Sequence, residues 1–172
     1  MRLPFVEIPT TGVRFDIEDV SWFPDSEVAR QGRLDASVFL QRNENRVTVT
    51  GTIAVTFVFA CDRCLESFVA PRQIEFSLEV ELVEAGGQAM PGVEHVCSPD
   101  EMDVVYVDVP VVDLHNVLRQ QIFLALPLKK LCSDDCRGLC SQCGANLNLE
   151  ACGCARGNHQ SPFAVLRGLK KE

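Results

Sequence analysis

Hydrophobic and polar residues alternate along much of the first half of the chain. Between Val47 and Phe59 the odd positions are apolar except for Gly51, and the even positions from 48 to 56 are Thr or Ala. A two-residue period is typical of a β-strand that buries one face. From Ile74 to Leu82 a second apolar series alternates with polar residues, mostly glutamates, which predicts a strand with an acidic outer face.

Other short segments extend this pattern into a sheet. The apolar run 34–40 is followed by the polar cluster 42–46, which predicts an antiparallel hairpin with the strand that starts at Val47. Segments 5–8 and 13–17 are expected to add an edge, and 104–109 to form a short strand. The stretch 84–103 has no period and contains Gly86-Gly87 and Pro91-Gly92, so it is expected to be a loop. Together these segments predict an antiparallel β-meander of at least three strands.

Two helices are expected to accompany this sheet. Asp113 is a suitable N-cap for a helix with one apolar stripe from Leu114 to Ala125, which Pro127 ends. Ser161-Pro162 opens a second, short helix that reaches Leu169. The pattern therefore predicts an α+β fold with one or two covering helices. We expect a sheet domain with its covering helix over 1–128, and over 129–172 a cysteine-rich tail with the short helix packed on it.

The candidate chemistry lies in the spacing of the cysteines. Cys61 and Cys64 form a C-x2-C pair at the end of a predicted strand, and six more follow in the tail with the spacing C-x3-C-x3-C-x2-C-x8-C-x-C. Tetrahedral zinc requires four ligands, which two such close pairs supply, and a glycine such as Gly144 suits the tight turn of a zinc knuckle. In the preferred partition one site has Cys140, Cys143, Cys152 and Cys154, and the other has Cys61, Cys64, Cys132 and Cys136. The rival partition joins Cys61 and Cys64 to Cys140 and Cys143.

Sites with four cysteine ligands are closed, which predicts one or two structural zinc ions and no catalytic metal. Thiolates also hold iron–sulfur clusters, and spacing alone discriminates poorly between the two. Cys97 stands alone and is expected to be a free thiol. The sequence contains no P-loop, dinucleotide-binding glycine pattern or nucleophile elbow, so we expect a protein that is not an enzyme.

Charge narrows the range of partners. The chain has 172 residues and a net charge of −8, which excludes a uniformly basic protein that coats nucleic acid. The first 118 residues carry 8 basic and 20 acidic residues, whereas the remainder carries 8 and 4. The start resembles no signal peptide and no run is long enough to span a bilayer. We therefore expect a soluble cytoplasmic protein, in which clustered thiols hold metal.

Several of these segments together resemble the YceD family. They are Cys61-Asp62-Arg63-Cys64-Leu65-Glu66, Asp113-Leu114 with Leu124-Ala125-Leu126-Pro127, the segment from Cys132 to Asn148, and Ser161-Pro162-Phe163-Ala164-Val165-Leu166. Members are known as large ribosomal RNA subunit accumulation proteins. The resemblance implies a role in keeping or maturing large-subunit ribosomal RNA in the bacterial cytoplasm.

The expected function is therefore that of a non-catalytic ribosome-biogenesis factor with zinc shaping its tail. Its partner is expected to be a ribosomal RNA precursor, or else a basic ribosomal protein or assembly factor, with no membrane and no small-molecule substrate. An RNA-processing enzyme such as a nuclease, or a thiol redox protein using Cys61 and Cys64, are the alternatives. The side chains expected to contact the partner are Lys129, Lys130, Arg137, Arg156, Arg167, Lys170 and Lys171.

Overall fold

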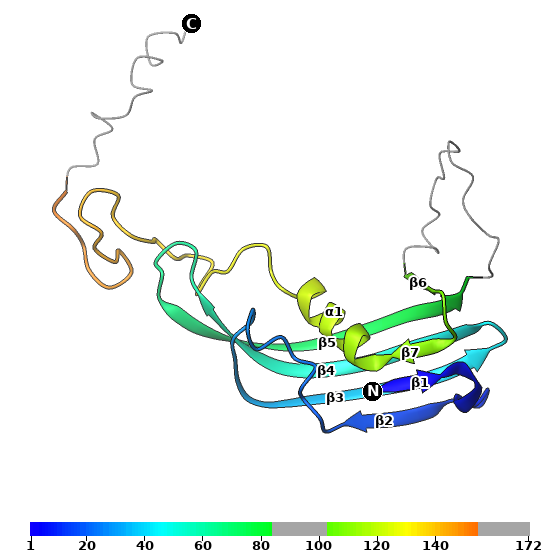
Figure 1. Ribbon diagram of the computed structural model, residues 1–172. Coiled ribbons are helices and arrows are strands. Elements are labelled where there is room, and N and C mark those ends of the chain that lie inside the picture. The colour runs from blue at the N-terminus through cyan, green and yellow to red at the C-terminus, as the bar shows by residue number, and fades with distance from the viewer. Residues whose placement is uncertain (84–102, 155–172) are drawn as a thin grey trace, which may run out of the picture. The chain divides into compact units, whose positions relative to one another are not determined.

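The structure, a computed structural model drawn in Figure 1, describes residues 1–83 and 103–154. The chain divides into two compact units. The first comprises Met1–Phe59 and Ser67–Lys129, and the second comprises Ala60–Glu66 together with the chain from Lys130 onward. The expected loop from residue 84 and the expected helix that starts at Ser161 lie outside the described residues.

A five-stranded sheet with the order β2-β3-β4-β5-β6 forms the body of the first unit. The antiparallel pairing of β3 with β4 brings Leu40 opposite Val49 and Asn43 opposite Arg46, which confirms the hairpin predicted around 42–46. β2 pairs antiparallel with β3 and confirms the edge expected at 13–17. The strands are β2 (Val13–Ile17), β3 (Arg30–Asn43), β4 (Arg46–Ala60), β5 (Ser67–Leu82) and β6 (Val104–Val107).

The strand β6 runs parallel to β5, with Val80 opposite Val105 and Leu82 opposite Val107. The expectation of a purely antiparallel meander is wrong at this edge, and the sheet is mixed. Alternation of apolar residues predicts a strand but not its direction. A parallel neighbour requires a crossover of about a dozen residues or more, and the segment 83–103 is long enough to provide it.

The N-terminus forms a separate small sheet. β1 (Arg2–Pro4) pairs antiparallel with β7 (Val111–Asp113). The strand expected at 5–8 is wrong, because Phe5–Glu7 is a 3-10 turn, η1, in which the amide of Ile8 donates to the carbonyl of Phe5. Phe5 and Ile8 are both buried, and a spacing of three residues places both side chains on the same side of such a turn.

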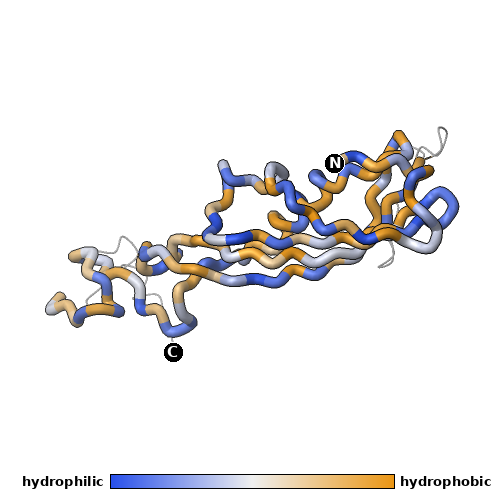
Figure 2. Tube along the Cα trace, turned by 90° about the horizontal axis from the view of Figure 1, so that it is seen from below, coloured by the Kyte–Doolittle hydropathy of each residue, from blue (hydrophilic) through white to orange (hydrophobic). Residues whose placement is uncertain are grey.

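The alternating residues predicted to face the core do so. Apart from the half-buried Gly51, the odd positions of β4 are buried, with Val47, Val49 and Phe57 completely inaccessible to solvent, and Leu78 and Val80 of β5 are buried as well. Figure 2 shows the resulting alternation of hydrophobic and hydrophilic residues along the strands.

The helix α1 (Leu114–Leu124) supplies the second layer of this core. The Asp113 carboxylate accepts a hydrogen bond from the amide of Asn116, which confirms the predicted N-cap. Figure 1 shows α1 beside the sheet. The buried residues of the helix follow the predicted stripe and are Leu114, Val117, Leu118 and Ile122.

Candidate metal centres

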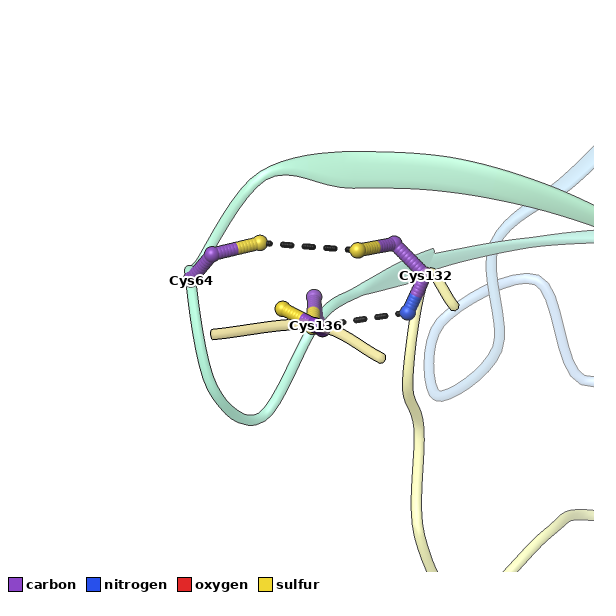
Figure 3. Close-up of side chains that lie close together, drawn as sticks. Cys64, Cys132 and Cys136 are labelled. Atoms are coloured by element: carbon purple, nitrogen blue, oxygen red, sulfur yellow. Dashed lines mark hydrogen bonds between the residues drawn. The ribbon is translucent and has the colours of Figure 1, made fainter. Parts of the chain in front are cut away.

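Four cysteine sulfurs of the second unit gather into a group that we call the hairpin centre, consisting of Cys61, Cys64, Cys132 and Cys136. All four sulfurs lie within 4.8 Å of one another, and Figure 3 shows Cys64, Cys132 and Cys136 close together. The Cys64 and Cys132 sulfurs are 3.7 Å apart, and those of Cys61 and Cys136 are 3.8 Å apart. A disulfide requires about 2.05 Å. Four sulfurs at about 2.3 Å from one tetrahedral ion lie about 3.8 Å from each other, so the spacing fits zinc.

The first two ligands of the hairpin centre lie in the tight turn between β4 and β5. The amide of Leu65 donates to the carbonyl of Cys61 at 2.9 Å and closes the turn. Leu65 has a φ of 62°, in the left-handed region that normally favours glycine. In the same turn, the amides of Arg63 and Cys64 donate to the Cys61 sulfur.

Two residues between these cysteines connect the turn to the segment with the other two ligands. The amide of Asp62 donates to the carbonyl of Lys130, and the Asp62 carboxylate accepts from the Lys130 amide, both at 2.7 Å. Arg63 donates to the carbonyls of Asp134 and Cys136 at 3.3 and 2.8 Å. The ligands, which are 68 residues apart in the case of Cys64 and Cys132, are thus held together by backbone and side-chain hydrogen bonds.

The second group, the tail centre, consists of Cys140, Cys143, Cys152 and Cys154, whose sulfurs also lie within 4.8 Å of one another. Its first pair repeats the geometry of the hairpin turn: the amide of Gly144 donates to the carbonyl of Cys140 at 2.9 Å, and Gly144 has a φ of 74°. The tail centre is less buried than the hairpin centre, where three of the four cysteines are buried. The two groups coincide with the preferred partition and not with the rival one.

The electrostatics of the hairpin centre favour a bound cation. Burial raises the pKa of the Cys61 thiol, but hydrogen bonds from the amides of Cys64, Arg63 and Cys132 outweigh it and lower the pKa to about 6. The Cys132 thiol behaves in the opposite way: its hydrogen bond with the Cys136 sulfur, together with burial, raises the pKa of Cys132 to about 12. Four thiolates this close repel one another, and a divalent ion removes that conflict.

In the tail centre, too, one thiol has a lowered pKa and another a raised pKa. Hydrogen bonds from the amides of Cys143 and Gln142 lower the pKa of Cys140 to about 6. The neighbouring Cys143 sulfur, with burial, raises the pKa of Cys154 to about 12. Both groups therefore have the donor set and the spacing of a closed tetrathiolate site, and neither leaves an open position for a catalytic water.

One further residue at the hairpin centre, Asn148, was not predicted from the sequence. Asn148 Nδ2 donates to the Cys136 sulfur at 3.3 Å, while Asn148 Oδ1 accepts from the amide of Arg137 at 2.7 Å. Burial raises the pKa of Cys136, but the bonds from Asn148 and from the Gly138 amide outweigh it and hold the pKa below its usual range. Asn148 ends the segment that resembles the YceD family, which is the one signal in the sequence that pointed to it.

The structure locates only three of the basic residues expected to contact a partner. Lys129 and Arg137 are exposed, and the backbone of Lys130 is bonded to Asp62. The other four, Arg156, Arg167, Lys170 and Lys171, lie outside the described residues. Cys97, the expected free thiol, lies outside them too.

Comparison with known proteins places these centres in a family. The sequence model of the family described as large ribosomal RNA subunit accumulation protein YceD matches residues 49–170, a range that includes the eight cysteines of the two centres. No solved structure matches the chain. In the described residues, no helix is both long and apolar enough to cross a membrane.

Curated relatives come from plants and mycobacteria. A chloroplastic YCED homolog 1 of Arabidopsis thaliana, named as a large ribosomal RNA subunit accumulation protein, is 24% identical over 90% of this chain and 52% of its own length. Its Zea mays counterpart is 28% identical over 78% of this chain and 53% of its own. An uncharacterised protein of Mycobacterium tuberculosis is 30% identical over 68% of this chain and 53% of its own. The chain thus spans about half the length of the curated relatives it matches.

Proposed function

The chain belongs to the YceD family, and from that premise we propose that it is a non-catalytic ribosome-biogenesis factor that supports accumulation or maturation of large-subunit ribosomal RNA. The observation that carries this proposal is the family match over 49–170, which includes both groups of cysteines. A cytoplasmic location is part of the proposal, because a reducing compartment keeps such thiols available for metal.

Structural zinc is the second part of the proposal. The residues of the hairpin centre and of the tail centre would each hold one ion as a closed tetrathiolate, which fixes the shape of the second unit. A unit of this size has a small core, so metal ligation would supply much of its stability. In this role zinc provides shape and no reactivity.

Charge guides the choice of partner. The described part of the second unit, 60–66 with 130–154, carries three basic and five acidic residues. Each zinc tetrathiolate adds a formal charge of about −2. This part of the surface therefore suits a basic ribosomal protein or assembly factor, whereas direct contact with RNA would depend on the basic residues from Arg156 to Lys171.

Crosslinking in cells, followed by identification of both bound RNA and bound protein, tests this function. The matched variant Cys140→Ser/Cys143→Ser removes half of the tail centre without changing the charged side chains. We expect ribosomal precursors or ribosomal proteins with the unchanged protein and a clear loss with the variant. Recovery of neither class of component with the unchanged protein would overturn the proposal.

Salt dependence distinguishes the two kinds of partner. Binding to RNA phosphates releases counterions, so an RNA contact through several basic residues should weaken about 10-fold or more between 50 and 200 mM salt. Measuring the affinity of the purified protein for precursor RNA at both salt concentrations checks this expectation. Nuclease activity of highly pure protein that is lost on changing one carboxylate would instead indicate the alternative, an RNA-processing enzyme.

A further inference from the structure

The loop between the two ligand pairs of the tail centre folds back on the chain that leads out of the hairpin centre. The amide of Leu147 donates to the carbonyl of Gly138 at 2.9 Å, and the amide of Cys140 donates to the carbonyl of Ala145 at 2.8 Å. Between these two bonds Leu139 forms an antiparallel bridge with Asn146. The loop of one centre is therefore ordered by the segment that joins it to the other centre.

Asn148 extends this connection to a ligand of the hairpin centre itself. Its side chain bonds the Cys136 sulfur and the amide of Arg137, and it is held in place by Asn146, whose Oδ1 accepts from Asn148 Nδ2 at 2.9 Å and from the Asn148 amide at 3.0 Å. A residue in the loop of the tail centre thus contacts a ligand of the hairpin centre.

The strength of this contact depends on metal. A hydrogen bond to a metal-bound thiolate is stronger than one to a neutral thiol, because the sulfur carries more negative charge. Filling the hairpin centre therefore favours the conformation of Asn148 seen here, and with it the order of the loop between Cys143 and Cys152. A loop that is already ordered costs less entropy to close around the second ion.

We propose that the two metal centres are thermodynamically coupled: the hairpin centre binds first, and Asn148 then raises the affinity of the tail centre. This inference rests on the proposed function only in that both groups bind metal. The order follows from burial, since three of the four hairpin ligands are buried and none of the tail ligands is. Asn148 is a positioning residue here, and reciprocity requires that the tail centre strengthen the hairpin centre by the same factor.

Stepwise titration of metal-free protein with Co²⁺ in an anaerobic cell tests the coupling, because cobalt bound to thiolates absorbs strongly. The variant Asn148→Ala keeps all eight cysteines of the two centres. We expect it to bind two ions, with the second step about 10-fold weaker than in the unchanged protein. The control Leu149→Ala truncates a side chain that is 80% exposed in the same loop, and should titrate like the unchanged protein.

Two other measurements test the order in which the centres bind metal and the reciprocity of their coupling. After one equivalent of Zn²⁺, alkylation with iodoacetamide and peptide mapping should show the four hairpin cysteines protected and the four tail cysteines modified, relative to metal-free protein. The variant Cys61→Ser/Cys64→Ser should bind its one ion about 10-fold more weakly than the second step of the unchanged protein. The variant Cys152→Ser/Cys154→Ser should match the first step, and should hold its ion about 10-fold more weakly than the hairpin centre of the fully loaded protein does.

The outcomes separate the two proposals. Two bound ions whose affinities are unchanged by Asn148→Ala would overturn the coupling and leave structural zinc intact. Protection of the tail cysteines first would overturn the order of binding. Failure of the unchanged protein to bind any Co²⁺ or Zn²⁺ would overturn both the coupling and the proposed metal centres.

Discussion

At the residue scale, Leu65 has a left-handed backbone conformation that normally favours glycine. The matching position in the tail centre is Gly144, and both amides close their turns at 2.9 Å. A side chain in this conformation costs about 1–2 kcal/mol relative to the right-handed region, a cost that glycine avoids.

Leu65→Gly should therefore stabilise the zinc-loaded protein. Leu65 is 66% exposed, so little packing is lost, and we expect the free energy of unfolding to rise by about 0.5–1 kcal/mol. Urea denaturation of the zinc-loaded protein measures the change. Leu65→Ala serves as the control, because it removes the same side chain but keeps the strained conformation; an equal gain from both substitutions would contradict the argument.

Gly138 and Gly144 separate backbone conformation from crowding. Both have φ above 70°, but a Cβ at Gly138 would lie 2.9 Å from the Arg63 carbonyl oxygen, whereas a Cβ at Gly144 would meet nothing within 4 Å. We expect Gly138→Ala to lower the free energy of unfolding by about 2–4 kcal/mol and Gly144→Ala by about 1 kcal/mol. Equal losses in urea denaturation would show that the contact with Arg63 contributes nothing.

At the scale of elements, Asp113 links the start of α1 to the small N-terminal sheet. Its carboxylate accepts from the amide of Asn116 at 3.3 Å and from Arg2 Nε at 3.0 Å. Partial burial raises the pKa of Asp113, but the hydrogen bonds from Arg2 and Asn116 outweigh it and hold the pKa below the ordinary value of 3.8.

Asp113→Ala should remove the helix cap and lower the free energy of unfolding by about 1 kcal/mol at neutral pH. A carboxyl whose pKa is lowered by folding stabilises the protein above its unfolded pKa, and this stabilisation is lost as the pH falls through the folded value. The difference between the original protein and the variant should therefore shrink below about pH 4. Asp113→Asn, which keeps a capping oxygen without the charge, should lose less stability at neutral pH. Thermal unfolding across this pH range measures all three proteins.

The elements that the sequence predicted best are those with the most regular burial. The period of two in β4 and the apolar stripe of α1 repeat over several turns or residue pairs, so local pattern was sufficient. The direction of β6 and the turn at Phe5 were missed, because pairing direction and a single 3-10 turn depend on tertiary contacts that no short window contains.

At the scale of the whole molecule, spacing predicted that the cysteines form groups and favoured one division of them, but it did not exclude the rival division. Both partitions used close pairs, and choosing between them requires knowing which turn lies beside residues 132–136. The hydrogen bonds of Asp62 and Arg63 determine this, and those two side chains lie inside the C-x2-C motif, in which only the sulfurs follow a spacing rule. Asn148 was missed for the same reason, since a residue that bonds a ligand has no spacing rule of its own.

The division of charge also belongs to this scale. By its numbers of basic and acidic residues the tail is basic, but four of the seven residues expected to contact a partner lie beyond residue 154. The described part of the second unit is acidic even before metal is counted. The basic character therefore belongs to the last eighteen residues of the chain, and the folded cysteine-rich part presents a different surface to a partner.

The most direct test is the metal content of protein purified under reducing conditions, measured by elemental analysis against protein concentration. We predict two zinc ions per chain, and one in the Cys140→Ser/Cys143→Ser variant, with the hairpin centre still filled. Protein that contains no zinc, or that contains iron and sulfide in its place, would contradict the account.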